Sequence, residues 1–267
     1  MNNHDISWLS LGLGSLLLLI PLFIFIYYKT KLVKPFIIAF ARMFVQLLLV
    51  GVYLKVIFEL DSVWLNLLWV LLMMVAATAT ILKRTEMKTK YFISSVSIGV
   101  FAGIALNTLI FAFVIIGFDV FFSARYIIPI TGMIIGNCLS NAIIGIRAFY
   151  QGILNEEDYY RYNLVLSGSR KSALFLYIST ALSEAFNPSI ASLATMGLIW
   201  LPGMMTGQIL GGTNPFIAIK YQMIVMVAIF ASGVITTVVS ILISQKSAFN
   251  DFDMLRKEIV VRTKKKV

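Results

Sequence analysis

The sequence contains little charge, one cysteine and one histidine. Asp, Glu, Lys and Arg together make up 13% of its 267 residues, and the single cysteine and histidine are Cys138 and His4. One cysteine cannot form an internal disulfide, and one cysteine with one histidine gives no metal-ligand cluster. A soluble domain carries about a quarter charged residues. The composition therefore argues against a soluble globule and indicates neither a disulfide scaffold nor a metal site.

Catalytic and nucleotide-binding motifs are missing as well. The apolar segments contain no pair of Glu, Asp or His, no H-E-x-x-H and no G-x-S-x-G. The stretch GSRKS, residues 168–172, resembles the end of a phosphate-binding loop. That loop requires glycine directly before its lysine, and here Arg170 precedes Lys171. We expect no enzymatic activity, no nucleotide site and no cofactor.

Long apolar runs are what the sequence does contain. Hydrophobic residues make up 60% of it and the mean hydropathy is +0.91. A spanning helix needs about 20 mainly apolar residues, and continuously apolar runs favour helices over a barrel. The sequence predicts a single transmembrane domain over 1–267, an all-α polytopic membrane helical bundle with about seven transmembrane helices. These are expected at 8–28, 36–58, 63–82, 92–117, 127–149, 190–210 and 216–244.

The basic residues predict the orientation of the bundle. Lys and Arg are concentrated after the first, third, fifth and seventh runs, and the chain carries 22 of them against 12 Asp and Glu. Cytoplasmic loops are enriched in Lys and Arg, so we expect the N-terminus outside and the C-terminus in the cytoplasm of a multi-pass protein in the cell (inner) membrane. The charge excess then reflects topology rather than nucleic-acid binding. Lys264–Lys266 either contact anionic headgroups or are simply solvated.

One cytoplasmic connection, residues 150–189, is much longer than the others. Within it Gly168 interrupts the pattern, and 171–183 has helical character with one apolar face. Asn187-Pro188 is predicted to turn the chain before the next span, and Glu184, close to this point, is expected to remain in water. A folded amphipathic loop is typical of a partner-binding segment, although a helix lying at the membrane interface has the same pattern.

Small residues form two ridges on the fifth and sixth predicted spans. They recur at four-residue steps, at Gly132, Gly136 and Ser140 and at Gly203, Gly207 and Gly211. Such ridges let helix backbones approach closely. The two ridges could meet each other, or each could face a second copy of the chain.

The sixth predicted span is also interrupted by proline and polar residues. Pro202 removes one helical hydrogen bond and is expected to kink this span. Thr206 and Gln208 follow Pro202 in the sixth span, and Asn137 and Asn141 lie in the fifth span. These side chains should face protein or water rather than lipid, either as contacts between helices or as the lining of a pathway. Met204-Met205 is better explained by apolar packing than by ligation of a soft metal.

Three stretches carry a resemblance to a known family. RYIIPITGMIIGN (125–137), LPGMMTGQILGG (201–212) and IAIKYQM (217–223) are similar to the iron-export-type (FetB/YbbM-like) ABC transporter permeases. That family is related to plant permeases linked to aluminium tolerance. The likeness covers most of the chain from the second span onward, and LPGMMTGQIL is its most specific part.

The resemblance implies a permease subunit that pairs with a separate ABC-type ATPase, most simply as a homodimer, and that exports iron or another small solute. It also implies that the long cytoplasmic loop couples the ATPase to the spans. The coupling residues expected there are Leu166, Gly168, Ser169, Ala173, Leu174, Tyr177 and Ile178. The alternatives from the residues alone are a self-sufficient secondary transporter or channel, an intramembrane enzyme and a scaffold.

Overall fold

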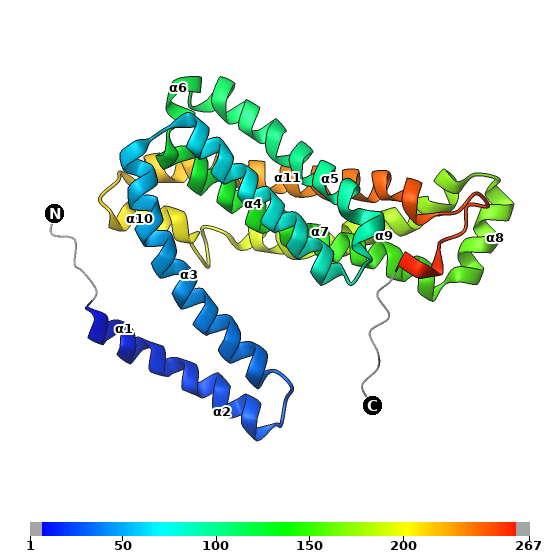
Figure 1. Ribbon diagram of the computed structural model, residues 1–267, viewed down its shortest axis with the longest axis horizontal. Helices are drawn as coiled ribbons and strands as arrows, with labels where there is room; N and C mark the ends of the chain where they lie inside the picture. The colour runs from blue at the N-terminus through cyan, green and yellow to red at the C-terminus, as the bar shows by residue number, and fades with distance from the viewer. Residues whose placement is uncertain (1–6, 260–267) are drawn as a thin grey trace. The chain divides into compact units, whose positions relative to one another are not determined.

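A computed structural model describes residues 7–259, apart from the side chains of Asp119 and Lys257 (Figure 1). His4 and Lys264–Lys266 lie outside the described residues. Six helices are long and apolar enough to cross a membrane: Trp8–Tyr27, Val33–Leu60, Val63–Thr85, Thr89–Ile115, Ala124–Asn155 and Pro215–Ala248. No strand occurs between residues 7 and 259. The predicted all-helical membrane class is confirmed, and the six helices match six of the seven predicted spans.

The chain divides into two compact units, with the boundary after Asp61. In the described part of the first unit, α1 (Trp8–Ser15), the 3₁₀ turn η1 (Leu16–Leu18) and α2 (Leu19–Tyr27) form one apolar segment, and α3 (Val33–Leu60) follows. The Ser7 hydroxyl accepts a hydrogen bond from the Ser10 amide and caps α1. In α3, Ile57 is buried and most other side chains are exposed, as expected for lipid-facing helices.

The second unit contains the packed core. Its elements are α4 (Val63–Thr85), α5 (Thr89–Ile110), the π-turn η2 (Phe111–Ile115), α6 (Phe118–Phe121), α7 (Ala124–Asn155), α8 (Glu157–Ser167), α9 (Arg170–Thr195), α10 (Gly203–Leu210), α11 (Pro215–Ala248) and η3 (Lys257–Ile259). Helix α7 packs against α4, α5, α9 and α11. Near the end of α7, the Tyr150 ring meets Phe92 edge-on and its hydroxyl lies 2.6 Å from the Ser244 hydroxyl. This hydrogen bond satisfies a phenol that is completely buried.

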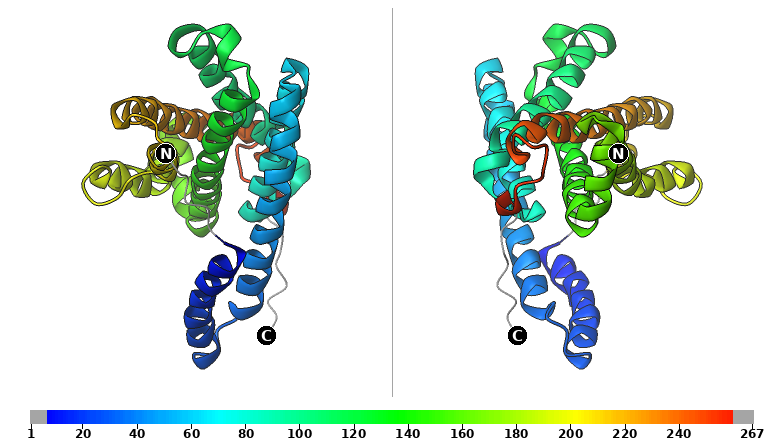
Figure 2. Two further views of the ribbon diagram at one scale, coloured as in Figure 1. Left: turned by 90° about the vertical axis from the view of Figure 1, so that its left-hand side faces the viewer. Right: turned by 90° about the vertical axis from the view of Figure 1, so that its right-hand side faces the viewer.

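The predicted helix at 190–210 is wrong, because the structure breaks it in the middle. Helix α9 ends at Thr195, Gly197 has a left-handed φ of +82°, and its amide closes a turn on the Trp200 carbonyl at 3.0 Å. Pro202 then precedes α10 in an extended conformation, and its carbonyl accepts a hydrogen bond of 3.0 Å from the Thr206 amide. Pro202 therefore starts a new helix rather than kinking an existing one, since proline favours an extended residue before it. Helix α10 lies beside α11 (Figures 1 and 2).

The predicted turn at Asn187-Pro188 is also wrong. Pro188 lies inside α9, which continues from Arg170 to Thr195. A proline costs a helix one backbone hydrogen bond. Before it, Ala181, Ala185 and Phe186 are buried in the core, and after it the Ser189 hydroxyl is bonded to Asn141 on α7. The long connection at 150–189 thus consists of the end of α7, the separate helix α8 and most of α9. Gly168 ends α8 with a φ of +60°.

Candidate functional site

The candidate site is the seam where α7 and α9 pack side by side in opposite directions. Small residues on this seam allow close approach. A Cβ placed at Gly145 would lie 3.4 Å from the Ala185 Cβ, and one at Gly152 would lie 3.3 Å from Cδ1 of Tyr177. Close packing of this kind brings the polar side chains along the seam within reach of one another.

Asn141 joins three helices at the middle of the seam. It lies on α7 and is 6% exposed, and its Oδ1 accepts a hydrogen bond of 3.2 Å from the Ser189 hydroxyl on α9. Its Nδ2 would lie 2.7 Å from a Cβ at Gly233 on α11, so only glycine fits opposite it. Asn141 thus makes contacts between helices, and it also lines the cavity beside the helix break, so both of its predicted roles stay open.

A small cavity of about 150 Å³ lies next to the break between α9 and α10, with apolar side chains from α9 and α11 and polar side chains in its lining. Its polar lining comes from α7, α9 and the turn after α9: Asn137, Asn141, Ser189, Ser192 and Trp200. The Trp200 indole donates to the Thr195 hydroxyl at 3.3 Å and so ties the turn to the end of α9. Discontinuous helices beside polar cavities mark the solute sites of many transporters. This cavity is therefore the part of the chain best suited to line a pathway.

The residues of the LPGMMTGQILGG stretch are less involved in packing than predicted. The Thr206 hydroxyl donates to the Pro202 carbonyl at 3.1 Å, inside its own helix, and Gln208 is half-buried. Met205 is buried and lines an apolar hollow of about 790 Å³ between α9, α10 and α11, with Met223 and Met226. That lining is consistent with the expected apolar role of Met205.

The two predicted small-residue ridges do not contact each other within the chain. A Cβ at Gly136, Gly203 or Gly207 would meet no atom within 4 Å, and one at Gly211 would meet only carbonyls of its own helix. A Cβ at Gly132 would lie 3.1 Å from Cε of Met73, and Ser140 is exposed. The alternative role, contact with a second copy, stays a prediction.

The closest helix pair is one that the sequence analysis did not single out. Gly99 and Gly103 on α5 face Ser232, Thr236 and Ser240 on α11 so closely that a Cβ at either glycine would clash. The Ser232 hydroxyl donates to the Gly103 carbonyl at 2.9 Å, and the Asn107 amide also contacts this hydroxyl. The glycines on α5 and the small polar residues on α11 each recur at four-residue steps, and this spacing in the sequence could have identified the contact.

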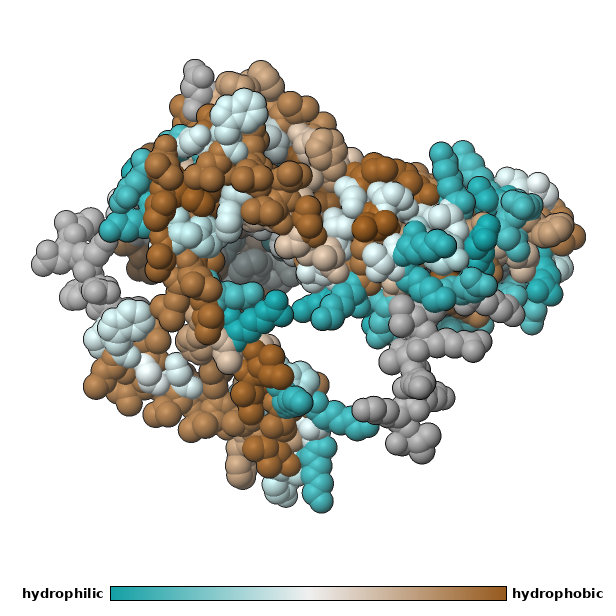
Figure 3. All heavy atoms as spheres, viewed as in Figure 1, coloured by the Kyte–Doolittle hydropathy of each residue, from teal (hydrophilic) through white to brown (hydrophobic). Residues whose placement is uncertain are grey.

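Many polar side chains lie at the α8 end of the second unit on the face shown in Figure 3. The tail that follows α11 contacts α8 and α9 at this end. The Arg170 guanidinium lies 2.8 Å from the Asp253 carboxylate and 5.6 Å from the centre of the Phe249 ring. The Tyr160 hydroxyl donates to the Asp253 carbonyl at 2.6 Å, and burial is the main reason why the pKa of Tyr160 rises to about 12. The tail thus connects α8, α9 and α11.

The predicted coupling residues divide into a buried and an exposed set. Ala173, Leu174 and Tyr177 are buried, and Ile178 is half-buried, so the apolar face predicted for 171–183 packs into the chain itself. Gly168 forms the left-handed end of α8, and Ser169 precedes α9. Leu166 is 71% exposed. Only the exposed set can touch another protein directly.

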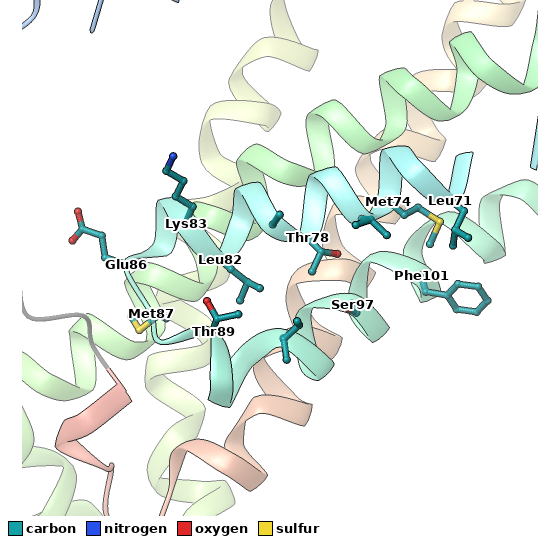
Figure 4. Close-up of a pocket in the computed structure, with 13 residues that line it drawn as sticks. Leu71, Met74, Thr78, Leu82, Lys83, Glu86, Met87, Thr89, Ser97 and Phe101 are labelled. Carbon is teal, nitrogen blue, oxygen red and sulfur yellow. The ribbon is translucent and has the colours of Figure 1, made fainter. Parts of the chain in front are cut away.

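A separate apolar groove of about 830 Å³ runs between α4 and α5 (Figure 4). Leu71, Met74 and Leu82 belong to its lining, while Lys83 and Glu86 lie at one end. Glu86 is also 3.8 Å from the Arg147 guanidinium. Thr78, Thr89 and Ser97 also line the groove, but most of its surface is apolar, which suits hydrocarbon chains better than a polar solute.

Acidic and metal-binding side chains are sparse in the described part of the chain. No group of three or more His, Cys, Asp or Glu residues that could hold a metal ion occurs between residues 7 and 259. Cys138, on α7, is buried and unpaired. Within residues 7–259, a metal site would therefore contain at most two His, Cys, Asp or Glu side chains, and neutral groups would have to supply the other ligands.

Comparison with known proteins shows one family along almost the whole chain. Residues 8–249 match the "Uncharacterised protein family (UPF0014)". The chain is 33% identical to the "Probable iron export permease protein FetB" of Escherichia coli K12 over the full length of both. It is 32% identical to the "UPF0014 membrane protein YjkA" of Bacillus subtilis over 94% of this chain and 98% of that one.

Plant proteins are similar too. Identity to the "Protein ALUMINUM SENSITIVE 3" of Arabidopsis thaliana is 28% over 78% of this chain and 75% of the plant protein. No solved structure matches the chain.

Proposed function

Since the chain belongs to the UPF0014 family of membrane proteins, we propose that it is the permease subunit of an ATP-binding-cassette transporter. A separate ATPase subunit would hydrolyse ATP, and this chain would form the path for the solute without a catalytic role. The name of the Escherichia coli relative supports outward transport of iron or another small solute. The proposed location is the cytoplasmic (inner) membrane.

Seven crossings are proposed, with the N-terminus outside and the C-terminus inside. Six would be the continuous helices, and the seventh would be α9 and α10 together, joined by the turn at 196–202. Ser189 contacts Asn141, and Tyr177 lies close to Gly152. These two contacts mean that α9 runs antiparallel to α7, which supports this path. The seventh crossing is then a broken helix beside a polar cavity.

The break supports a homodimer. Leu198 and Ile199 in the turn are 90% and 78% exposed, and open space surrounds Gly203 and Gly207. Non-helical backbone at membrane depth must be covered by protein or line a water-filled cavity. A second copy packed on α10 would provide that cover. It would also place the α7–α9 seams of the two copies along one shared pathway.

The observation that carries the proposal is the apolar surface at the α8 end, which the proposed topology places in the cytoplasm. Large apolar and aromatic side chains are exposed there, at Tyr162, Val165, Leu166 and Phe175, with exposed fractions of 62% to 81%. Lipid cannot cover this surface in the cytoplasm. Val165 and Leu166 lie three and four residues after Tyr162 and so share one face of α8 with it. Exposed apolar side chains grouped in this way indicate a protein partner, and the proposed partner is the ATPase.

Copurification tests this assignment. A tagged chain is extracted in mild detergent from its native host, and the expected result is an ABC-type ATPase bound in a stable ratio. Leu166→Asp should abolish the association, whereas Leu32→Asp, at an exposed leucine of the proposed cytoplasmic connection between α2 and α3, serves as the matched control. Solute flux without ATP through liposomes that contain this chain alone would instead support the secondary transporter or channel.

A further inference from the structure

A polar cavity of about 370 Å³ opens between the end of α7 and the middle of α9. It lies on the same α7–α9 seam as Asn141, toward the α8 end. Its polar lining consists of oxygen-bearing side chains from the two helices: Gln151, Asn155, Glu156, Tyr177, Thr180 and Glu184. In the proposed topology it is the cytoplasmic mouth of the seam.

The two carboxylates in this cavity are not neutralised by the chain. No lysine or arginine lines it. The described ion pairs involve Glu86, Glu157 and Asp253 but neither Glu156 nor Glu184. Both carboxylates are exposed to solvent and neither is paired with a basic side chain among the described residues, so each is available to a cation.

Tyr177 is the second sign that something binds here. Its side chain is 5% exposed, and its hydroxyl makes no hydrogen bond of standard geometry within the described part of the chain. The Glu156 carboxylate lies near this hydroxyl, which can still donate or accept a hydrogen bond. A buried polar group without a partner costs free energy unless a ligand or water supplies one.

The chemistry of this lining points to a hard metal cation. Divalent cations such as Mg²⁺ and Mn²⁺ prefer carboxylate, amide and water oxygens over nitrogen and sulfur. At about 30 Å³ per water molecule, a cavity of this size holds an ion together with several of its waters.

We propose that this cavity is the cytoplasmic loading site for a divalent metal cation. The carboxylates of Glu156 and Glu184 would hold the ion, and the amides and hydroxyls of the cavity would hydrogen-bond its waters. This inference rests on the proposed permease function and specifies its cargo and point of loading. From here the seam leads past Asn141 to the cavity beside the helix break.

The test measures Mn²⁺ binding to the full-length chain in nanodiscs of neutral phosphatidylcholine. Bound Mn²⁺ is followed by loss of the free-ion electron paramagnetic resonance signal. We expect Glu156→Gln and Glu184→Gln each to weaken binding by about tenfold or more, and the double variant to abolish it, because each change removes one charged ligand. Glu157→Gln is the matched control, since this neighbouring carboxylate lies outside the cavity and pairs with Arg161. It should change affinity by less than about twofold.

Three results would overturn the inference: no Mn²⁺ binding to the wild-type chain, undiminished binding to the double variant, or equal weakening by Glu157→Gln. If Glu184→Gln releases the ATPase but leaves Mn²⁺ binding intact, then the cavity instead binds a basic side chain of the partner. The proposed function fails separately. The permease function is contradicted if the ATPase does not copurify, whether or not the chain binds Mn²⁺. Copurification without Mn²⁺ binding rejects the loading site alone.

Discussion

The Nη1 atom of Arg170 lies 2.8 Å from Oδ1 of Asp253, which links the first residue of α9 to the tail that follows α11. Both side chains are partly exposed, at 34% and 42%. A pair this exposed contributes about 0–1 kcal/mol to stability. Its position is more informative than its strength, because it connects the proposed coupling segment to the longest helix of the bundle.

We expect Asp253→Asn to lower ATP-driven transport several-fold and to change the free energy of unfolding by less than about 1 kcal/mol. The charge-reversed double variant, Arg170→Glu with Asp253→Arg, should restore part of the transport. Arg161→Ala is the control, since it removes an ion pair that lies wholly within α8. Normal transport by Asp253→Asn would show that the tail is not part of the coupling path.

Leucine substitutions should separate packing within the chain from contact between copies. Gly103→Leu inserts a side chain where α5 and α11 touch, and overpacking of this kind costs about 1–3 kcal/mol. Gly207→Leu enters open space, so the chain should fold normally but lose dimerisation and transport. Thermal unfolding and light scattering in detergent measure the two effects, with Gly51→Leu, also in open space, as control. Wild-type dimers and flux in Gly207→Leu would remove the proposed interface.

The sequence predicted the continuous helices well, because hydropathy and length decide them. It located α3, α4, α7 and α11 to within a few residues, and it recognised Gly168 as a break and 171–183 as an amphipathic helix. These features depend on neighbours close in the chain.

Features that depend on tertiary packing were harder to predict. Asn187-Pro188 was expected to turn the chain and Pro202 to kink a helix. Instead α9 continues through Pro188, with Ala185 and Phe186 buried before it and Ser189 bonded to Asn141 after it, and the left-handed Gly197 breaks the chain before Pro202. Within one chain, Gly99 and Gly103 pack closely whereas Gly203 and Gly207 do not. All four have the same spacing, so the spacing alone could not distinguish them.

The single cysteine makes the polar cavity beside the helix break easy to probe. Cys138 is 3% exposed, so the wild-type chain should not react with a charged methanethiosulfonate reagent. Asn137→Cys, one residue away but exposed and lining the cavity, should react readily in membranes if water reaches this point.

Leu109→Cys is the control for that experiment. Leu109 is 54% exposed on α5, but in a membrane this surface should face lipid, where the reactive thiolate does not form. We expect labelling at position 137 to be at least about tenfold faster than at position 109, in line with the thiolate fraction. Equal rates would contradict a water-accessible cavity.

The final prediction concerns Gly197, whose left-handed φ of +82° lies at the break between α9 and α10. Gly197→Ala adds a side chain that meets no atom within 4 Å, so its cost should come from the backbone alone, about 1–2 kcal/mol. Gly203→Ala is the matched control, because Gly203 is helical and equally open; it should be neutral or slightly stabilising. Thermal unfolding measures the first effect, and ATP-driven flux shows whether the turn at 196–202 must keep its shape during transport. If Gly197→Ala unfolds at the same temperature as Gly203→Ala, then the break does not depend on the left-handed residue, and Pro202 alone must account for it.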